Sequence, residues 1–327
     1  MPEPSPTPQR HGRLLRIAAA FVVLLAVAGY LAVQYVTGGT GAPGCKVVSG
    51  RSDGATYEFT PEQAVNAATI SAVGTARGLP ERAVTIALAT ALQESGLRNI
   101  DYGDRDSLGL FQQRPSQGWG SPKQIMDPVY AAEKFYEHLA EVPGYTRLPL
   151  TVAAQRVQRS GFPQAYAKHE PDATLLAAAL TGRSAAALTC EGRPAATRAA
   201  GPDAVRAALL RDFGREVLEP AGMAVNGGAA ATPSPSASGR EESGGRTVTL
   251  PVTADGGSAA GRGPGQRGWQ LAHWAVANAS ELHIERVSYA GRVWTAGNTD
   301  SRWRPVEGGG AAGPERGAGA VRIVTAQ

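Results

Sequence analysis

A single glutamate near the end of an apolar helix is the residue best suited in this sequence to acid–base chemistry. Glu94 continues the row of Ala83, Ala87 and Ala91 at helical spacing, which would set its carboxyl group against apolar neighbours. Burial and the negative end of the helix dipole would both disfavour the charged carboxylate and raise its pKa. A carboxyl group that stays protonated near neutral pH can act as a general acid on a glycosidic oxygen. The alternative is a glutamate in the last helical turn with its head group in water.

A polar loop after Glu94 carries further carboxylates. Asp101, Asp104 and Asp106 could supply a second catalytic carboxylate, although clustered loop aspartates are more often turn formers. Their arrangement lacks the later glutamate of a calcium loop. The histidines show no metal-ligand spacing, and no Gly-rich phosphate loop follows a strand. The sequence therefore predicts neither a metal nor a cofactor.

Two segments around Glu94 resemble the soluble lytic transglycosylase family. Residues 91–96, Ala-Leu-Gln-Glu-Ser-Gly, are similar to the family's glutamate–serine pair at the end of a buried helix. Residues 109–112, Gly-Leu-Phe-Gln, are similar to its Gly-Leu-Met-Gln segment, which lines the cleft. Asp127-Pro128 and the following helix resemble a third recurring element. The resemblance covers about residues 80–140.

The resemblance implies a lysozyme-like fold and a cut between N-acetylmuramic acid and N-acetylglucosamine that leaves a 1,6-anhydro product. Carried over to this sequence, Glu94 is the single acid and base. Ser95 would orient the structure at the substrate site, and Gln112 and Gln113 would bind substrate. The alternative for Gln112 is a loop residue whose side chain meets backbone groups.

Aromatic side chains are candidates for stacking on sugar rings. Tyr102 and Trp119 could do so, or they could be core residues. The family's Ala-Tyr-Asn element is missing, since its nearest counterpart, residues 154–158, has no tyrosine; Tyr166, eight residues later, could supply the ring. The family's asparagine and glycine in the third helix are also absent. These departures favour, as the alternative function, a noncatalytic peptidoglycan-binding or wall-assembly protein.

Helical spacing dominates the region that holds these residues. We expect residues 55–215 to form one mainly α domain, because no alternating strand pattern interrupts it. Helix starts are predicted at Pro61, at Pro80 and at Asp127-Pro128, and further helices over residues 151–159, 171–180 and 203–213.

A stretch rich in Gly, Ala, Ser and Pro, residues 216–246, is predicted to be a linker. It would lead to a small α+β module, residues 247–327, which positions the protein in the wall or binds a partner. His273 and Trp274 in this module are predicted to be packing residues. We expect a helix over residues 268–280 and strands over residues 247–252, 284–289, 292–296 and 320–325.

The amino-terminal part contains an apolar run, residues 17–36, that predicts a transmembrane helix. About 20 apolar residues suffice to cross a hydrocarbon core of ~30 Å. Three arginines in residues 1–16 predict a cytoplasmic tail, so that a stalk, residues 37–54, and the rest of the chain would lie outside the cell. The alternative is a cleaved signal peptide, although the run is longer than the usual apolar core of one.

The only two cysteines, Cys45 and Cys190, bracket the central domain on the predicted external side, so we expect them to form a disulfide. A lipidated Cys45 is the alternative. The charge balance of 32 Lys and Arg against 28 Asp and Glu argues against nucleic acid as a partner. The sequence thus predicts a membrane-anchored, extracytoplasmic muramidase of the lytic transglycosylase type, acting on peptidoglycan glycan strands.

Overall fold

The computed structural model of the chain describes residues 44–161, 164–192, 201–218, 245–252, 263–297, 302–306 and 319–326. Two buried helices pack against each other near its centre, α2, Pro61–Ala76, and α3, Glu81–Ser95. Helix α2 begins at Pro61 because Thr60 and Gln63 form a capping box, in which each side chain accepts a hydrogen bond from the other residue's backbone. Helix α3 ends where Gly96 adopts the left-handed conformation. The predicted starts of both helices are confirmed.

Shorter helices surround this pair. The predictions at Asp127-Pro128 and over residues 151–159, 171–180 and 203–213 are confirmed to within a residue or two. Helix α3 contacts α5, α6 and α7, which place the side chains around its carboxyl end. The helices are α4, Pro122–Ile125; α5, Pro128–Ala140; α6, Leu150–Gln158; α7, Glu170–Leu180; and α8, Gly201–Phe213; three short 3-10 helices are η1, Pro115–Gln117; η2, Ala165–His169; and η3, Arg215–Leu218.

A small antiparallel sheet holds the disulfide. Its strands are β1, Cys45–Val48; β2, Thr56–Phe59; and β3, Leu188–Cys190, in the order β2-β1-β3. Cys45 lies opposite Cys190 in the pairing of β1 with β3, and the two form a disulfide. The predicted disulfide is confirmed, whereas this sheet was not predicted, and β1 falls within the segment expected to be a stalk.

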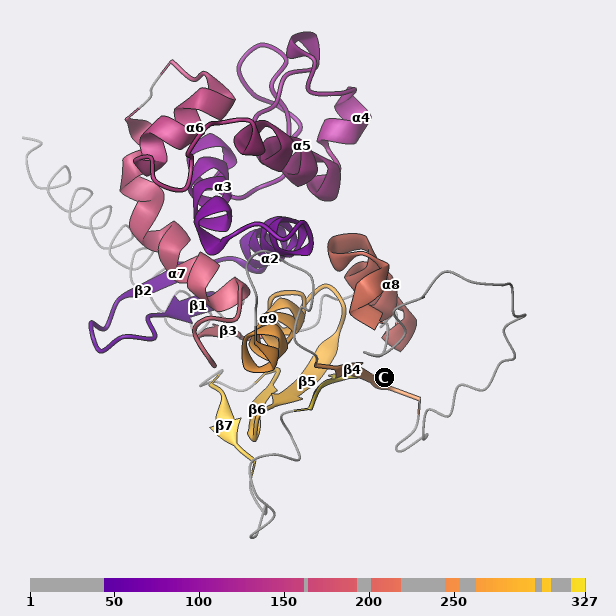
Figure 1. Cartoon of the computed structure of the whole chain (residues 1–327). Coiled ribbons are helices and arrows are strands. Elements are labelled where there is room, and N and C mark those ends of the chain that lie inside the picture. The colour runs from indigo at the N-terminus through magenta and orange to yellow at the C-terminus, as the bar shows by residue number, and fades with distance from the viewer. Residues whose placement is uncertain are drawn as a thin grey trace, which may run out of the picture. The chain divides into compact units, whose positions relative to one another are not determined.

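The carboxyl-terminal residues form a second, larger antiparallel sheet in the order β4-β8-β5-β6-β7. Helix α9, Pro264–Ala277, packs against strands β5 and β8 (Figure 1). The predicted helix and four predicted strands are confirmed, and β7 is additional. The strands are β4, Thr247–Pro251; β5, Ile284–Tyr289; β6, Arg292–Thr295; β7, Arg304–Pro305; and β8, Ala320–Thr325.

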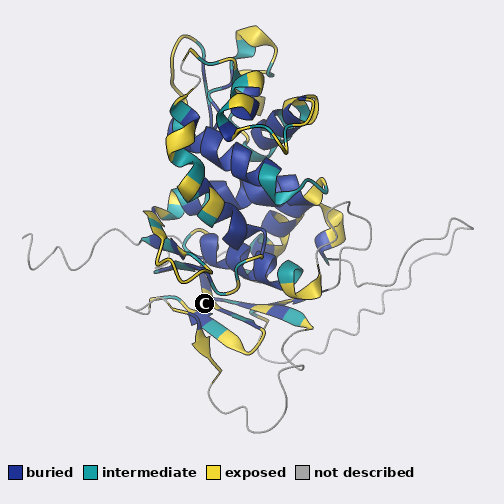
Figure 2. Cartoon of the chain, turned by 60° about the vertical axis from the view of Figure 1, so that its left-hand side comes forward, coloured by how far each residue is buried: buried dark blue, intermediate teal, exposed yellow. Residues whose placement is uncertain are grey.

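Helix α9 also packs against the rest of the chain, so the two sheets and the helices share one hydrophobic core. It contacts α2, α7 and β3, and its Gln270 amide donates to the Thr75 hydroxyl of α2. The Trp274 indole donates to the Asp212 carboxylate of α8 at 2.8 Å. Figure 2 shows the resulting band of buried residues running from the helices into the sheet. The described residues, which begin at residue 44, all belong to one compact unit.

The predicted fold class, a mainly α lysozyme-like domain after a transmembrane helix with a small separate α+β module, is therefore wrong. The described residues form a mixed α/β structure with two sheets, and α9 is buried among the other helices instead of covering an independent module. The predicted tail and transmembrane helix, residues 1–16 and 17–36, lie outside the described residues, as does most of the predicted linker. Among the helices that the structure describes, none has the length and apolar character needed to cross a membrane.

His273 of α9 is a titratable side chain buried in this packing. The ring is fully buried, its Nδ1 lies 2.8 Å from the Ala179 carbonyl, and its Nε2 accepts from the Ala187 amide at 3.1 Å. These two partners fit a neutral ring that carries its proton on Nδ1. Burial lowers the pKa of His273 to about 4. A lowered histidine pKa means that the folded protein favours the neutral ring. The stabilisation that this ring provides is therefore complete above the pKa of histidine in the unfolded chain, about 6.5, and is lost as the pH falls.

We expect the free energy of unfolding to fall by about 3 kcal/mol between pH 6.5 and 4 from His273 alone. Urea unfolding of wild type and of His273→Gln across this range measures it, and the variant should lose most of the pH dependence. His138→Gln, which changes an exposed histidine, is the matched control and should keep the wild-type slope. Equal slopes for wild type and His273→Gln would show that His273 does not carry the effect.

Candidate active site

Glu94 lies in the last turn of α3 with its carboxyl group partly buried. Burial is the largest effect on this group and raises its pKa, while hydrogen bonds from Tyr166 and Gln158 act in the opposite direction. The Tyr166 hydroxyl donates to Oε1 of Glu94 at 2.7 Å. The Tyr166 hydroxyl group therefore orients the carboxyl group, which takes up a proton more readily than an exposed glutamate.

Tyr166 comes from η2, which packs against the end of α3. It is fully buried, and burial followed by the nearby charge of Glu94 raises its pKa. The phenol consequently keeps its proton and serves as a hydrogen-bond donor. The sequence suggested that Tyr166 could supply a ring at the site, and the structure brings its hydroxyl group onto the candidate acid.

Gln158 is a site residue that sequence reasoning missed. It is the last residue of α6, and its amide nitrogen donates to the Phe111 carbonyl at 2.7 Å. Its side chain also lowers the pKa of the Glu94 carboxyl group. The comparison of residues 154–158 with the missing family element pointed to the right segment, but nothing in its spacing distinguished Gln158 from its neighbours.

The segment 109–112 is fixed beside Glu94 by Ser95. The Ser95 hydroxyl is buried and lies within hydrogen-bonding distance of two carbonyls, Leu110 at 2.8 Å and Ala91 at 3.1 Å. At Gly109, φ is +74° and a Cβ would lie 2.7 Å from the Ile125 carbonyl, so the turn requires glycine. Ser95 thus positions the Gly-Leu-Phe-Gln segment, and both partners of its hydroxyl group are protein carbonyls.

The two glutamines of this loop have different surroundings. Gln112 is half-buried, and its amide donates to the carbonyls of Tyr102 and Gly109, both at 3.3 Å. Gln113 is 1% exposed and donates to the Ala131 carbonyl of α5 at 3.0 Å. Gln112 was predicted either to bind substrate or to be a loop residue that contacts backbone groups, and its hydrogen bonds are of the second kind. Gln113 packs the loop against α5.

The two aromatic candidates also differ. The Tyr102 side chain is 67% exposed, which leaves its ring open to a bound molecule. Trp119 is half-buried, with its ring 4.4 Å from that of His138 and its carbonyl accepting from the Tyr130 hydroxyl. Of the two, Tyr102 has the surface needed for stacking on a sugar ring.

The loop aspartates do not pair with Glu94. Asp106 accepts from the Arg114 guanidinium at 2.9 Å and from the Ser116 amide at 2.8 Å, and these bonds, the first above all, hold its pKa well below the usual range. Asp101 and Asp104 are exposed. Within the described part of the chain, no group of three or more His, Cys, Asp and Glu side chains is arranged to hold a metal ion. The chemistry available here is that of one carboxyl group with hydrogen-bond donors around it.

Comparison with known proteins concerns a different part of the chain. Residues 212–315 match the family described as VldE, C-terminal domain. This stretch begins at the end of α8 and includes β4, α9 and β5 to β7, so it lies wholly after Glu94 and Tyr166 in the sequence. No curated protein matches the chain. The candidate site therefore has to be interpreted from its own geometry.

The hydrogen bond from Tyr166 gives a direct test of that geometry. Tyr166→Phe is expected to raise the pKa of Glu94 further, because the lost donor favours the charged carboxylate. An NMR titration of the Glu94 side-chain carboxyl carbon measures the change. Tyr102→Phe removes a hydroxyl from an exposed ring and should leave this titration unaltered. An unchanged titration in Tyr166→Phe would mean that the two groups are not hydrogen-bonded in solution.

Proposed function

We propose that this protein cleaves the glycan strands of peptidoglycan with Glu94 as its single acid and base, in the manner of a lytic transglycosylase. The observation that carries the proposal is the partly buried Glu94 carboxyl group, with its raised pKa and the Tyr166 hydroxyl 2.7 Å away. The resemblance of residues 91–96 and 109–112 to that family supports it, since Ser95 ties these two segments together.

The proposed reaction needs only the proton of Glu94. The protonated carboxyl group donates to the glycosidic oxygen, the bond between this oxygen and C1 of the muramic acid breaks, and the leaving sugar departs with a hydroxyl group. The resulting Glu94 carboxylate accepts the proton of the sugar's 6-hydroxyl group, and the oxygen of that hydroxyl group bonds to C1. This step closes the 1,6-anhydro ring and restores the protonated Glu94. Tyr166 favours the carboxylate formed between the two steps, because its hydroxyl group donates to it.

The disulfide between Cys45 and Cys190 favours action in an oxidising compartment, since the reducing cytoplasm disfavours such bonds. We propose that the protein works outside the cytoplasm, where peptidoglycan is found. We also propose that residues 247–327 bind the cell wall or a protein partner.

The decisive experiment is incubation of the oxidised full chain with purified peptidoglycan, followed by mass spectrometry of the released muropeptides. The full chain is used because α9 is buried in the common core. Anhydro products that depend on Glu94 would support the proposal. Reducing-end products would overturn the transglycosylase mechanism in favour of hydrolysis, and sedimentation with the wall without any release would favour the noncatalytic alternative.

A further inference from the structure

The five-stranded sheet has one face buried and one face exposed. The residues paired across neighbouring strands project to the same face, and α9 packs on the face that carries Val248, Ile323, Val287 and Trp294, all of them buried. In Figure 1 the helices lie on one side of this sheet, and in Figure 2 exposed residues mark its strands. The opposite face therefore meets solvent.

Arginines stand on the exposed face, on three of its strands. The pairing register places Thr249, Arg322 and Ser288 side by side, and Val293 and Arg304 continue the same row across β6 and β7. Arg286 lies in the next row, opposite Val324 of β8 and Thr295 of β6. All three arginines are exposed. We call Arg286, Arg304 and Arg322 the arginine face.

Arg286 and Arg322 are diagonal neighbours on adjacent strands, with backbones separated by about 7 Å. Neither forms an ion pair with a described acidic residue; the nearby Glu285 lies 3.7 Å from Arg246. Residues 245–327 contain nine arginines and six acidic residues, so this part of the chain is basic. Two like charges side by side on a sheet repel each other, and an anion bound between them would remove that repulsion.

We propose that the arginine face binds a linear polymer that carries phosphate groups. Arginine pairs with phosphate, as it does with carboxylate, through two parallel N–H bonds, and binding of a carboxylate polymer is therefore an outcome of the test. The exposed hydroxyl groups of Thr249 and Thr295 add donors along the same face. A row of residues that runs across several strands suits an extended chain better than a compact ligand. The disulfide favours an extracytoplasmic polymer over nucleic acid. This inference does not depend on the activity proposed for Glu94.

The test is binding of a fluorescent poly(glycerol phosphate) chain to the full-length protein, followed by anisotropy at several salt concentrations. The double variant Arg286→Gln, Arg322→Gln should bind at least about ten-fold more weakly at low salt, and its plot of log affinity against log salt should flatten by about two. The matched control is Arg51→Gln, Arg147→Gln, which removes the same charge from exposed positions outside this sheet and should bind like wild type. A thermal melt of each variant confirms that it is folded.

Three outcomes would overturn the inference. The first is wild-type affinity in the Arg286→Gln, Arg322→Gln variant. The second is an equal loss in the control, which would mean that net charge alone decides binding. The third is equal or tighter binding of poly-L-glutamate, of oligo-dT or of phosphatidylglycerol vesicles, which would assign the face to a carboxylate polymer, a nucleic acid or a membrane surface.

Discussion

Glu94→Gln is expected to lower the rate of muropeptide release from peptidoglycan by about a thousand-fold, the effect typical of losing a general acid. Glutamine has nearly the same shape, and its amide oxygen can still accept the hydrogen bond from Tyr166, so the fold and the substrate contacts should persist. What the variant lacks is the transferable proton. The initial rate of product release, quantified by chromatography at saturating substrate, measures the loss, and cosedimentation with the wall should be unchanged.

Glu62→Gln provides the matched control, because it changes an exposed glutamate in the first turn of α2. Its rate should equal that of wild type. If Glu94→Gln released products within ten-fold of the wild-type rate, the proton would have to come from another group, and the proposed mechanism would fail.

Removal of the disulfide by the double variant Cys45→Ala, Cys190→Ala is expected to lower the free energy of unfolding by about 5 kcal/mol. The two cysteines are 145 residues apart, and a crosslink that closes so long a loop strongly restricts the unfolded chain. Both side chains are almost completely buried, so the variant also loses packing in the core. Urea unfolding followed by tryptophan fluorescence measures the change.

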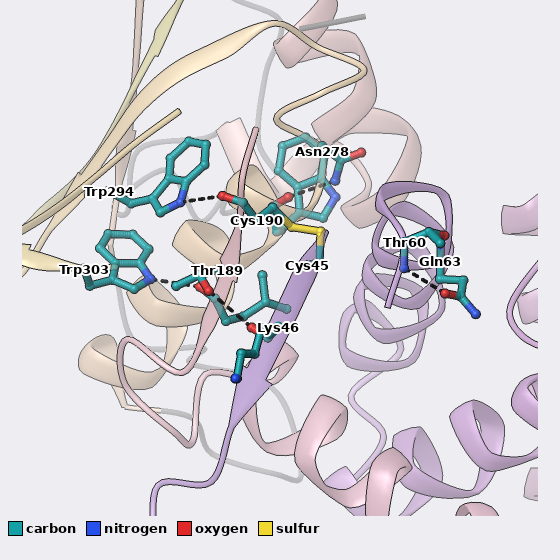
Figure 3. Close-up of a disulfide and its surroundings, with 11 residues drawn as sticks. Cys45, Lys46, Thr60, Gln63, Thr189, Cys190, Asn278, Trp294 and Trp303 are labelled. Atoms are coloured by element: carbon teal, nitrogen blue, oxygen red, sulfur yellow. Dashed lines mark hydrogen bonds between the residues drawn. A yellow bond between two sulfur atoms is a disulfide. The ribbon is translucent and has the colours of Figure 1, made fainter. Parts of the chain in front are cut away.

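The wild-type protein in a reducing agent is the internal control for this prediction. Its free energy of unfolding should approach that of the double variant, whereas the reducing agent should leave the double variant unchanged. Two indoles hold β3 independently of the disulfide: Trp294 donates to the Cys190 carbonyl at 3.1 Å and Trp303 to the Leu188 carbonyl at 2.9 Å (Figure 3). A loss below about 1 kcal/mol would show that contacts of this kind suffice to hold the strand.

Local signals in the sequence predicted where helices and several strands begin and end. The Thr60 capping box, Pro80 before α3 and Asp127 before Pro128 act within a few residues of themselves, so their effect is visible without the fold. The strands expected over residues 284–289 and 292–296 likewise correspond to the hairpin of β5 and β6. These signals are local because a helix end or a hairpin turn is satisfied by neighbouring backbone groups.

Partners far apart in the chain were not visible in the same way. Strands β1 and β3 pair across more than 140 residues; the two cysteines predicted that these segments meet, but the short, weakly patterned β3 did not predict a pairing of strands. Helix α9 was expected to cover a small module, whereas Gln270, His273 and Trp274 reach α2, α7 and α8. An apolar helix can pack against any apolar surface of matching shape, so the sequence of the helix does not predict which surface it contacts.

The candidate site likewise combines local features that the sequence predicts with contacts that form only in the folded protein. The sequence by itself determined that Glu94 ends a buried helix, that Ser95 follows it and that Cys45 and Cys190 are available to pair, because helical spacing and residue type are properties of the chain. Only the tertiary structure decided that Tyr166 and Gln158 face the Glu94 carboxyl group, since η2 and α6 reach it through packing against α3. The balance between burial, which raises the pKa of Glu94, and hydrogen bonding, which lowers it, depends on groups that come together only when the chain is folded.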